Sequence, residues 1–140
     1  MNQDAPLLLD TCAAIWISQE QQIADDALDA LQRAKTVGEF VYVSPVTAWE
    51  IGLLVSRGRL SSPMSPQRWF QRLMQAPEVR LAELSPDILI ASSFLPGVPP
   101  RDPADRILAA TAREHGYRLM TRDRPLLAYA AQGHVQALAC

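Results

Sequence analysis

Short apolar runs alternate along this chain with longer segments in which apolar residues recur at helical spacing. The run "PLLLD" at residues 6–10, continuously apolar until its final acid, is typical of a strand that a parallel sheet buries on both faces. Five short segments predict strands over 6–10, 39–44, 79–84, 117–121 and 134–138. The longer segments between these strands are predicted to be helical.

Pairs of residues that start helices mark where several of these longer segments begin. Ser or Asp accepts a hydrogen bond from a free amide of the first turn, and Pro fits the first helical position. Such pairs predict helices over 45–57, from 66 to about 76, from 86 onward, and from 103 to the closing Gly116. Residues 11–35 have a helical pattern with a break near Ser18, whereas 95–101 is predicted to be a loop and 122–126 a turn.

Regular alternation of strands and helices predicts the fold class. We expect one α/β domain over residues 1–140, with a mostly parallel central sheet flanked by helices on both faces. Sheets of this kind bind ligands beyond the carboxyl ends of their strands, where the strand order reverses. Functional side chains are therefore expected just after a strand or in the first turn of a helix.

Composition and charge exclude several classes of protein. The chain has 140 residues, 49% hydrophobic and 20% charged, and a net charge of −2, which does not favour a protein that coats nucleic acid. No apolar run reaches the ~20 residues of a transmembrane helix. The first residues lack the basic segment of a signal peptide, and two cysteines are too few for a disulfide framework. We therefore expect a cytoplasmic protein with no membrane partner.

Four acids fall where this fold would place a site. Asp10 ends the first strand, Asp123 follows the fourth, and Asp105 lies in the first turn of the helix that begins at 103. Helix capping or turn formation also explains each of them taken singly. Glu50 is harder to explain in this way, because its neighbours at helical spacing, which include Val46, are apolar and a buried carboxylate is costly unless it is paired.

Taken together, these acids indicate a cation site. Lysine occurs once, at Lys35, so any neutralising partner must be an arginine such as Arg106, Arg122 or Arg124. Carboxylates that crowd together must otherwise protonate or bind a cation. A set of oxygen ligands without His or Cys suits Mg²⁺ or Mn²⁺, and such sites serve the hydrolysis of phosphodiester bonds. The expected metal ligands are Asp10, Asp105 and Asp123.

Four blocks of the sequence, in order, resemble the acidic motifs of PIN domains, and most closely those of VapC-like toxins of toxin–antitoxin systems. They are "LLLDTCA", "VTAWEIGLL", "RDPADRILAATA" and "LMTRD", and together they span nearly the whole chain. The resemblance implies an Mg²⁺-dependent endoribonuclease whose catalytic acids correspond to Asp10, Glu50, Asp105 and Asp123. Thr11 and Thr121 match hydroxyl residues that the family tends to keep beside the acids.

The third block departs from the pattern of many relatives. Pro100 stands where they have His, and Ala104 stands where they have Phe, although no acid is lost. Either Asp102 or Asp105 could therefore face the metal more directly. The helix start favours Asp105 as the ligand, with Asp102 as the N-cap in a supporting position.

The resemblance also implies partners. A VapC-like toxin would cut RNA, form a homodimer and be held inactive by a small cognate antitoxin. Four apolar residues border the expected site and would suit an amphipathic helix of such a partner if they are exposed, or would be ordinary core if they are not. These residues are Trp16, Trp49, Leu53 and Leu54.

Two other functions fit parts of the sequence. A phosphoryl-transfer domain of the receiver or haloacid-dehalogenase kind also uses an Asp at a strand end. However, it needs paired acids after the first strand and, in receivers, a Lys at a strand end, and this chain lacks both. A non-catalytic PIN-like scaffold that binds RNA or protein is the alternative that stays open, although the presence of all four acids disfavours it.

Overall fold

A computed structural model describes residues 5–140, so the first four residues of the predicted domain lie outside the described part. The strands are β1 (Leu7–Leu9), β2 (Val41–Val43), β3 (Val79–Leu81), β4 (Arg118–Thr121) and β5 (Gln136–Ala139). The helices are α1 (Thr11–Ser18), α2 (Asp25–Val37), α3 (Pro45–Ser56), α4 (Pro66–Met74), α5 (Pro86–Ala91), α6 (Pro103–His115) and α7 (Arg124–Ala131).

The strands form one parallel sheet in the order β3-β2-β1-β4-β5. The central strand β1 pairs with β2 on one side and with β4 on the other. The chain leaves β1 toward β2 and returns to the opposite side of β1 only at β4, so the strand order reverses between β1 and β4. The predicted α/β class is therefore confirmed, and the sheet is parallel throughout the described residues.

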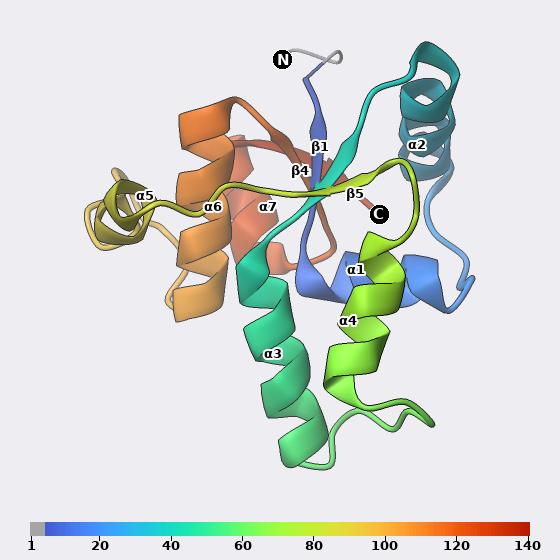
Figure 1. Cartoon of the computed structure of the whole chain (residues 1–140). Helices are drawn as coiled ribbons and strands as arrows, with labels where there is room; N and C mark the ends of the chain where they lie inside the picture. The colour runs from blue at the N-terminus through green and yellow to red at the C-terminus, as the bar shows by residue number, and fades with distance from the viewer. Residues whose placement is uncertain (1–4) are drawn as a thin grey trace.

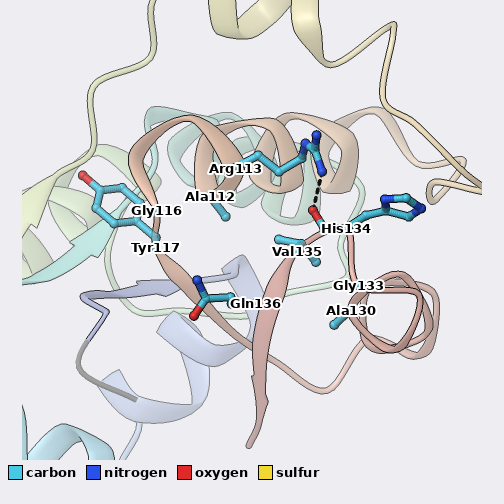
Figure 2. Close-up of a pocket in the computed structure, with 9 residues that line it drawn as sticks. All are labelled: Ala112, Arg113, Gly116, Tyr117, Ala130, Gly133, His134, Val135 and Gln136. Carbon is cyan, nitrogen blue, oxygen red and sulfur yellow. Dashed lines mark hydrogen bonds between the residues drawn. The ribbon is translucent and has the colours of Figure 1, made fainter. Parts of the chain in front are cut away.

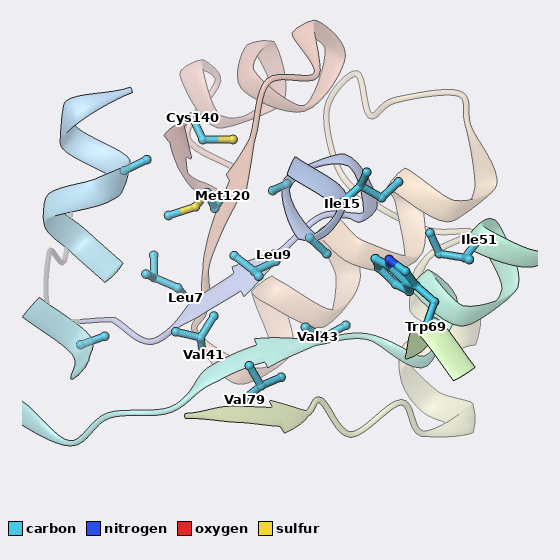
Figure 3. Packing of buried hydrophobic residues seen from close by; sticks show 14 residues of the cluster. Leu7, Leu9, Ile15, Val41, Val43, Ile51, Trp69, Val79, Met120 and Cys140 are labelled. Atoms are coloured by element: carbon cyan, nitrogen blue, oxygen red, sulfur yellow. The ribbon is translucent and has the colours of Figure 1, made fainter. Parts of the chain in front are cut away.

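Helices cover both faces of the sheet (Figure 1). Because side chains alternate along a strand, Leu7 and Leu9 face one core and Leu8 faces the other. The first core packs the sheet against α1, α2 and α4, with Trp69 of α4 among its largest members (Figure 3). The second core packs the sheet against α6 and α7. Helix α3 contributes to both cores and extends beyond the carboxyl ends of the strands.

Most predicted elements are present with boundaries that differ by a few residues. The helical pattern of 11–35 is divided into α1 and α2 near Ser18, as expected, and three Ser-Pro pairs cap α3, α4 and α5. Strands β2 and β3 are shorter than predicted. None of the helices within residues 5–140 combines the length and the apolar character that a bilayer-spanning segment requires.

The prediction of a simple turn over residues 122–126 is wrong. Helix α7 begins there, with Asp123 as its N-cap and Pro in its first turn. Leu126 and Tyr129, one helical turn apart, are fully buried against the second core, so apolar burial extends what looked like a turn into a helix. The signal was present in the sequence, because α6 also starts with an acid as N-cap and a Pro in its first turn.

Candidate functional site

The cleft at the carboxyl ends of the strands lies where the strand order reverses. Asp10 directly follows β1, and Asp123 follows the neighbouring strand β4. Helix α3 starts after β2 and carries Glu50, while α6 brings Asp102 and Asp105 to the same place with its first turn. Elements far apart in the sequence thus bring all the acids predicted for the site to one edge of the sheet.

Asp10 is held firmly at the floor of this cleft. It is 5% exposed and caps α1, accepting a hydrogen bond from the backbone N–H of Ala13 at 2.7 Å. Its second carboxylate oxygen accepts a short hydrogen bond from the hydroxyl of Thr121. Burial nevertheless raises the pKa of Asp10, as does the charge of Asp123, so these two hydrogen bonds offset the cost of burial only in part.

Thr121 links two of the acids. While its hydroxyl donates to Asp10, the same oxygen accepts the backbone N–H of Asp123 at 2.9 Å. Asp123 in turn caps α7, because its Oδ2 accepts the backbone N–H of Leu126 at 3.0 Å. The fully buried Thr121 therefore fixes the end of β1 relative to the start of α7.

Glu50 is held from the opposite side by a chain of hydroxyl groups. Its Oε1 accepts a short hydrogen bond from Thr11, and the Thr11 hydroxyl also lies 3.1 Å from that of Thr47. Since the one proton of Thr11 is directed to Glu50, Thr47 donates to Thr11 when the glutamate is ionised. Thr47 is fully buried on α3, one turn before Glu50, and its role was not predicted from the sequence. A threonine three residues before the acid on the same helix was the only signal.

Asp102 and Asp105 have different surroundings. The Oδ2 of Asp102 accepts the backbone N–H of Asp105 at 3.0 Å, so Asp102 is the N-cap of α6, as predicted. No residue of the described chain donates a hydrogen bond to the Asp105 carboxylate. Asp105 is therefore a half-buried carboxylate in the cleft without the compensation that Asp10, Glu50 and Asp123 receive.

The acids line a cleft of about 330 Å³. Its lining residues are Asp10, Thr11, Cys12, Trp16, Glu50, Asp102, Asp105, Arg122 and Asp123. The arginines near it point elsewhere, because Arg106 donates to the carbonyls of Ser92 and Pro100, and Arg122 donates to the carbonyl of Gln22. The negative charges of the cleft are thus not neutralised by these side chains.

Crowded carboxylates affect how tightly the cleft holds protons. Burial raises the pKa of Asp105, and the charges of Asp123, Asp102, Glu50 and Asp10 act in the same direction, so that together they raise it to about 8. Burial also raises the pKa of Glu50, against the hydrogen bond from Thr11. Cys12 lies beside these acids, and burial together with their charges raises the pKa of its thiol to about 11. The thiol therefore stays protonated and is a poor nucleophile.

Two observations define what the cleft can hold. Within residues 5–140, no three His, Cys, Asp or Glu side chains converge closely enough to enclose a metal ion by themselves. Mg²⁺, however, is usually bound by one or two carboxylates and completes its shell with waters and substrate phosphates. The all-oxygen donor set of the cleft fits that mode of binding and does not fit a closed site made only of protein ligands.

A larger cavity of about 530 Å³ lies at the opposite edge of the sheet (Figure 2). It is lined by the ends of α6 and α7 and the starts of β4 and β5, and includes Arg113, whose guanidinium donates to the carbonyl of His134. No carboxylate lines it, and it lies at the amino ends of the strands. Size alone therefore does not identify the functional site in this fold.

Comparison with known proteins places this geometry in a family. The model of the PIN domain matches residues 7–132, which include every acid of the cleft. The chain belongs to the PIN domain family. It is also 35% identical over 121 residues to Ribonuclease VapC22 of Mycobacterium tuberculosis, covering 86% of this chain and 88% of that protein. The predicted resemblance to PIN domains and VapC proteins is therefore confirmed.

Solved structures show the same PIN fold at lower identity. The structure of VapBC2 from Rickettsia felis bound to a promoter DNA fragment has a TM-score of 0.65 and 12% identity, and covers 95% of this chain and 97% of that one. FitAcB from Neisseria gonorrhoeae has a TM-score of 0.56 and 22% identity, and covers 94% of this chain and 96% of that one. At these identities the likeness supports the fold alone.

Proposed function

We propose that this PIN domain is a metal-dependent endoribonuclease and the toxin of a toxin–antitoxin pair. The observation that carries the proposal is the cleft of carboxylates at the point where the strand order reverses, with Arg106 and Arg122 beside it donating to backbone carbonyls instead of to the acids. Similarity to a protein named Ribonuclease VapC22 over most of both chains supports RNA as the substrate.

The proposed metal is Mg²⁺, or Mn²⁺ in its place, with Asp10, Asp105 and Asp123 as its ligands, one or two of them bound directly and the rest through water. Crowding and burial raise the pKa of Asp105 to about 8 and also raise that of Asp10, so a divalent cation would relieve charges that otherwise favour protonation. When bound, the cation would polarise the phosphodiester and stabilise the charge that develops on it. Thr121 and Asp102 support these ligands by fixing Asp10 and the start of α6.

Glu50 has a different role in this proposal. Thr11 occupies its Oε1, which leaves Oε2 to accept a proton from the water that attacks the phosphorus. Because burial raises the pKa of Glu50, this carboxylate is a stronger base than an exposed glutamate would be. The hydroxyl chain from Thr47 through Thr11 would keep that base oriented while the proton moves.

We further propose that a small cognate antitoxin covers the rim of the cleft and that the toxin forms a homodimer. Of the four apolar residues predicted to border the site, Trp49 is 53% exposed, and the other three are only partly buried. All four are therefore at least partly exposed, although Trp16 and Leu54 also pack against the first core. An amphipathic helix laid over them would bury apolar surface and could direct an arginine toward the carboxylates.

Substitution of the acids tests the nuclease proposal. Cleavage of total RNA should fall at least ~100-fold in each of four variants: Asp10→Asn, Glu50→Gln, Asp105→Asn and Asp123→Asn. Loss of a residue that only supports a metal ligand costs up to ~100-fold in activity, so loss of a residue of the site itself should cost at least as much. The exposed Asp29→Asn on α2 is the matched control and should cleave like the wild type. EDTA should stop cleavage, and Mg²⁺ or Mn²⁺ should restore it.

Several outcomes would contradict the proposal. Full activity of the folded Asp10→Asn variant would show that the cleft is not the site of cleavage. Undiminished cleavage in excess EDTA would show that the reaction needs no metal. A wild-type chain that binds RNA or the antitoxin with Mg²⁺ present, yet cuts nothing, would favour the non-catalytic scaffold. Co-expression with the neighbouring short reading frame, followed by co-purification and mass measurement, tests both partners.

A further inference from the structure

Arg122 differs from every other residue that lines the cleft, because it is the one basic side chain among the described lining residues. Its backbone is fixed on both sides, by the buried Thr121 before it and by Asp123, the N-cap of α7, after it. The side chain is exposed, yet it makes defined contacts. Those contacts determine whether the guanidinium pairs with the cleft carboxylates or stays open to another anion.

Two neighbours hold the guanidinium group away from the acids. Its Cζ lies 4.0 Å from the centroid of the Trp16 ring, and its Nη2 donates to the carbonyl of Gln22 at 2.9 Å. Trp16 belongs to α1 and Gln22 to the loop after it, so the group is braced by segments outside β4 and α7. Within residues 5–140 it forms no ion pair with a cleft carboxylate.

A braced and unpaired arginine beside a cluster of carboxylates suits an anionic ligand. The guanidinium has five N–H donors, and the described contacts use one of them for a hydrogen bond. Its planar fork matches the oxygens of a phosphate, and stacking on Trp16 reduces the entropy lost when it binds. A polyanion that approaches the cleft is repelled by the acids and attracted at this one point.

We propose that Arg122, braced by Trp16 and Gln22, binds a backbone phosphate of single-stranded RNA next to the phosphodiester that is cut. The inference rests on the proposed ribonuclease function and adds to it a specific phosphate contact outside the metal ligands. Arg122 is then a positioning residue, since it holds the strand while the carboxylates act on the neighbouring phosphate.

Binding of a labelled single-stranded oligoribonucleotide of mixed sequence tests this inference. Fluorescence anisotropy in the uncut Asp105→Asn background, with Mg²⁺ present, measures affinity without cleavage. Adding Arg122→Ala should weaken binding about tenfold, as expected for one lost charged hydrogen bond. The slope of log affinity against log salt should shrink by about 0.7, the value for one phosphate contact on a single strand.

Three matched variants separate this role from others. Arg124→Ala removes an exposed arginine two residues away that does not line the cleft, and should leave affinity and slope unchanged. Arg122→Lys keeps the charge and loses the fork, and should fall between the wild type and Arg122→Ala. In the cleaving chain with Asp105 intact, Arg122→Ala should raise KM much more than it lowers kcat.

These measurements distinguish a failure of the Arg122 inference from a failure of the nuclease proposal. A chain that cuts RNA, but whose RNA affinity and salt slope do not respond to Arg122→Ala, would overturn this inference and leave the nuclease proposal intact. A wild-type chain that binds RNA through Arg122 without cutting it would overturn the nuclease proposal alone. If Arg122→Ala abolishes capture of the antitoxin and leaves RNA binding unchanged, Arg122 belongs to a protein interface and the inference is wrong.

Discussion

Single hydroxyl groups hold two carboxylates of the cleft, Asp10 and Glu50, in place. Thr121 donates to Asp10 and accepts from the backbone of Asp123, while Thr11 donates to Glu50. A hydroxyl can act in both ways because it carries one proton and two lone pairs. At this scale the orientation of Asp10 and Glu50 depends on a neutral neighbour, and not on a counter-charge.

Replacing Thr11 tests this dependence. Burial raises the pKa of Glu50, and the hydrogen bond from Thr11 opposes that rise. Thr11→Val keeps the shape and removes the hydroxyl, so the pKa of Glu50 should rise further. If Glu50 is the base, the acidic limb of the pH–rate profile should then move to higher pH. Thr11→Ser retains the hydroxyl and should leave the limb in place, and a Val variant with the wild-type profile would contradict the role of Thr11.

Three residues that cap helices in this molecule also line the cleft. Asp10, Asp102 and Asp123 cap α1, α6 and α7, and all three line the cleft. The positive end of a helix dipole stabilises a carboxylate at an N-terminus. The same local chemistry that starts these helices thus also helps the fold to tolerate acids at one edge of the sheet.

The cap of α6 can be tested apart from the charge of its residue. Asp102→Ala should lower the free energy of unfolding by about 1 kcal/mol, the usual cost of losing an N-cap, as measured by urea denaturation. Asp102→Asn keeps an oxygen that can accept the N–H of Asp105 and should stay close to the wild type. Equal stability of the two variants would show that the cap contributes little and that Asp102 serves the cleft alone.

Stability of the whole molecule should depend on how the cleft is charged. Asp105 has a pKa of about 8 in the folded chain, against an ordinary value of 3.8. The folded chain therefore holds this proton more tightly than the unfolded chain does. The resulting stability is present at low pH and is lost as the pH rises from the ordinary carboxyl range toward about 8. The raised pKa values of Asp10 and Glu50 act in the same direction.

Thermal unfolding without metal measures this effect. The Tm of the EDTA-treated chain should fall as the pH rises through that range, and the fall should be shallower for Asp105→Asn, which has no charge to gain. Mg²⁺ should raise the Tm most at high pH, where the carboxylates are ionised and free to bind it. A Tm in EDTA that rises with pH over the same range would contradict the charge crowding described for the cleft.

The sequence by itself determined most elements and the places of the acids. Strand propensity and helix capping depend on residues that are close in the chain. They account for the apolar runs of β1 and β4, for the Ser-Pro pairs, and for Asp102 before Pro103. The signal for helix α7 was equally local, since Asp123 and Pro125 precede Leu126 and Tyr129 at helical spacing, although residues 122–126 were predicted to be a turn.

Only the tertiary structure decided how side chains distant in the sequence meet. Thr121 reaches Asp10 because β4 pairs with β1, and no local pattern specifies that pairing. Thr47 meets Thr11 only when α3 crosses α1, and Arg122 turns from the acids because Trp16 and Gln22 stand beside it. Such contacts depend on strand order and helix packing. Burial energy summed over the two cores sets that order, and it is a property of the whole chain.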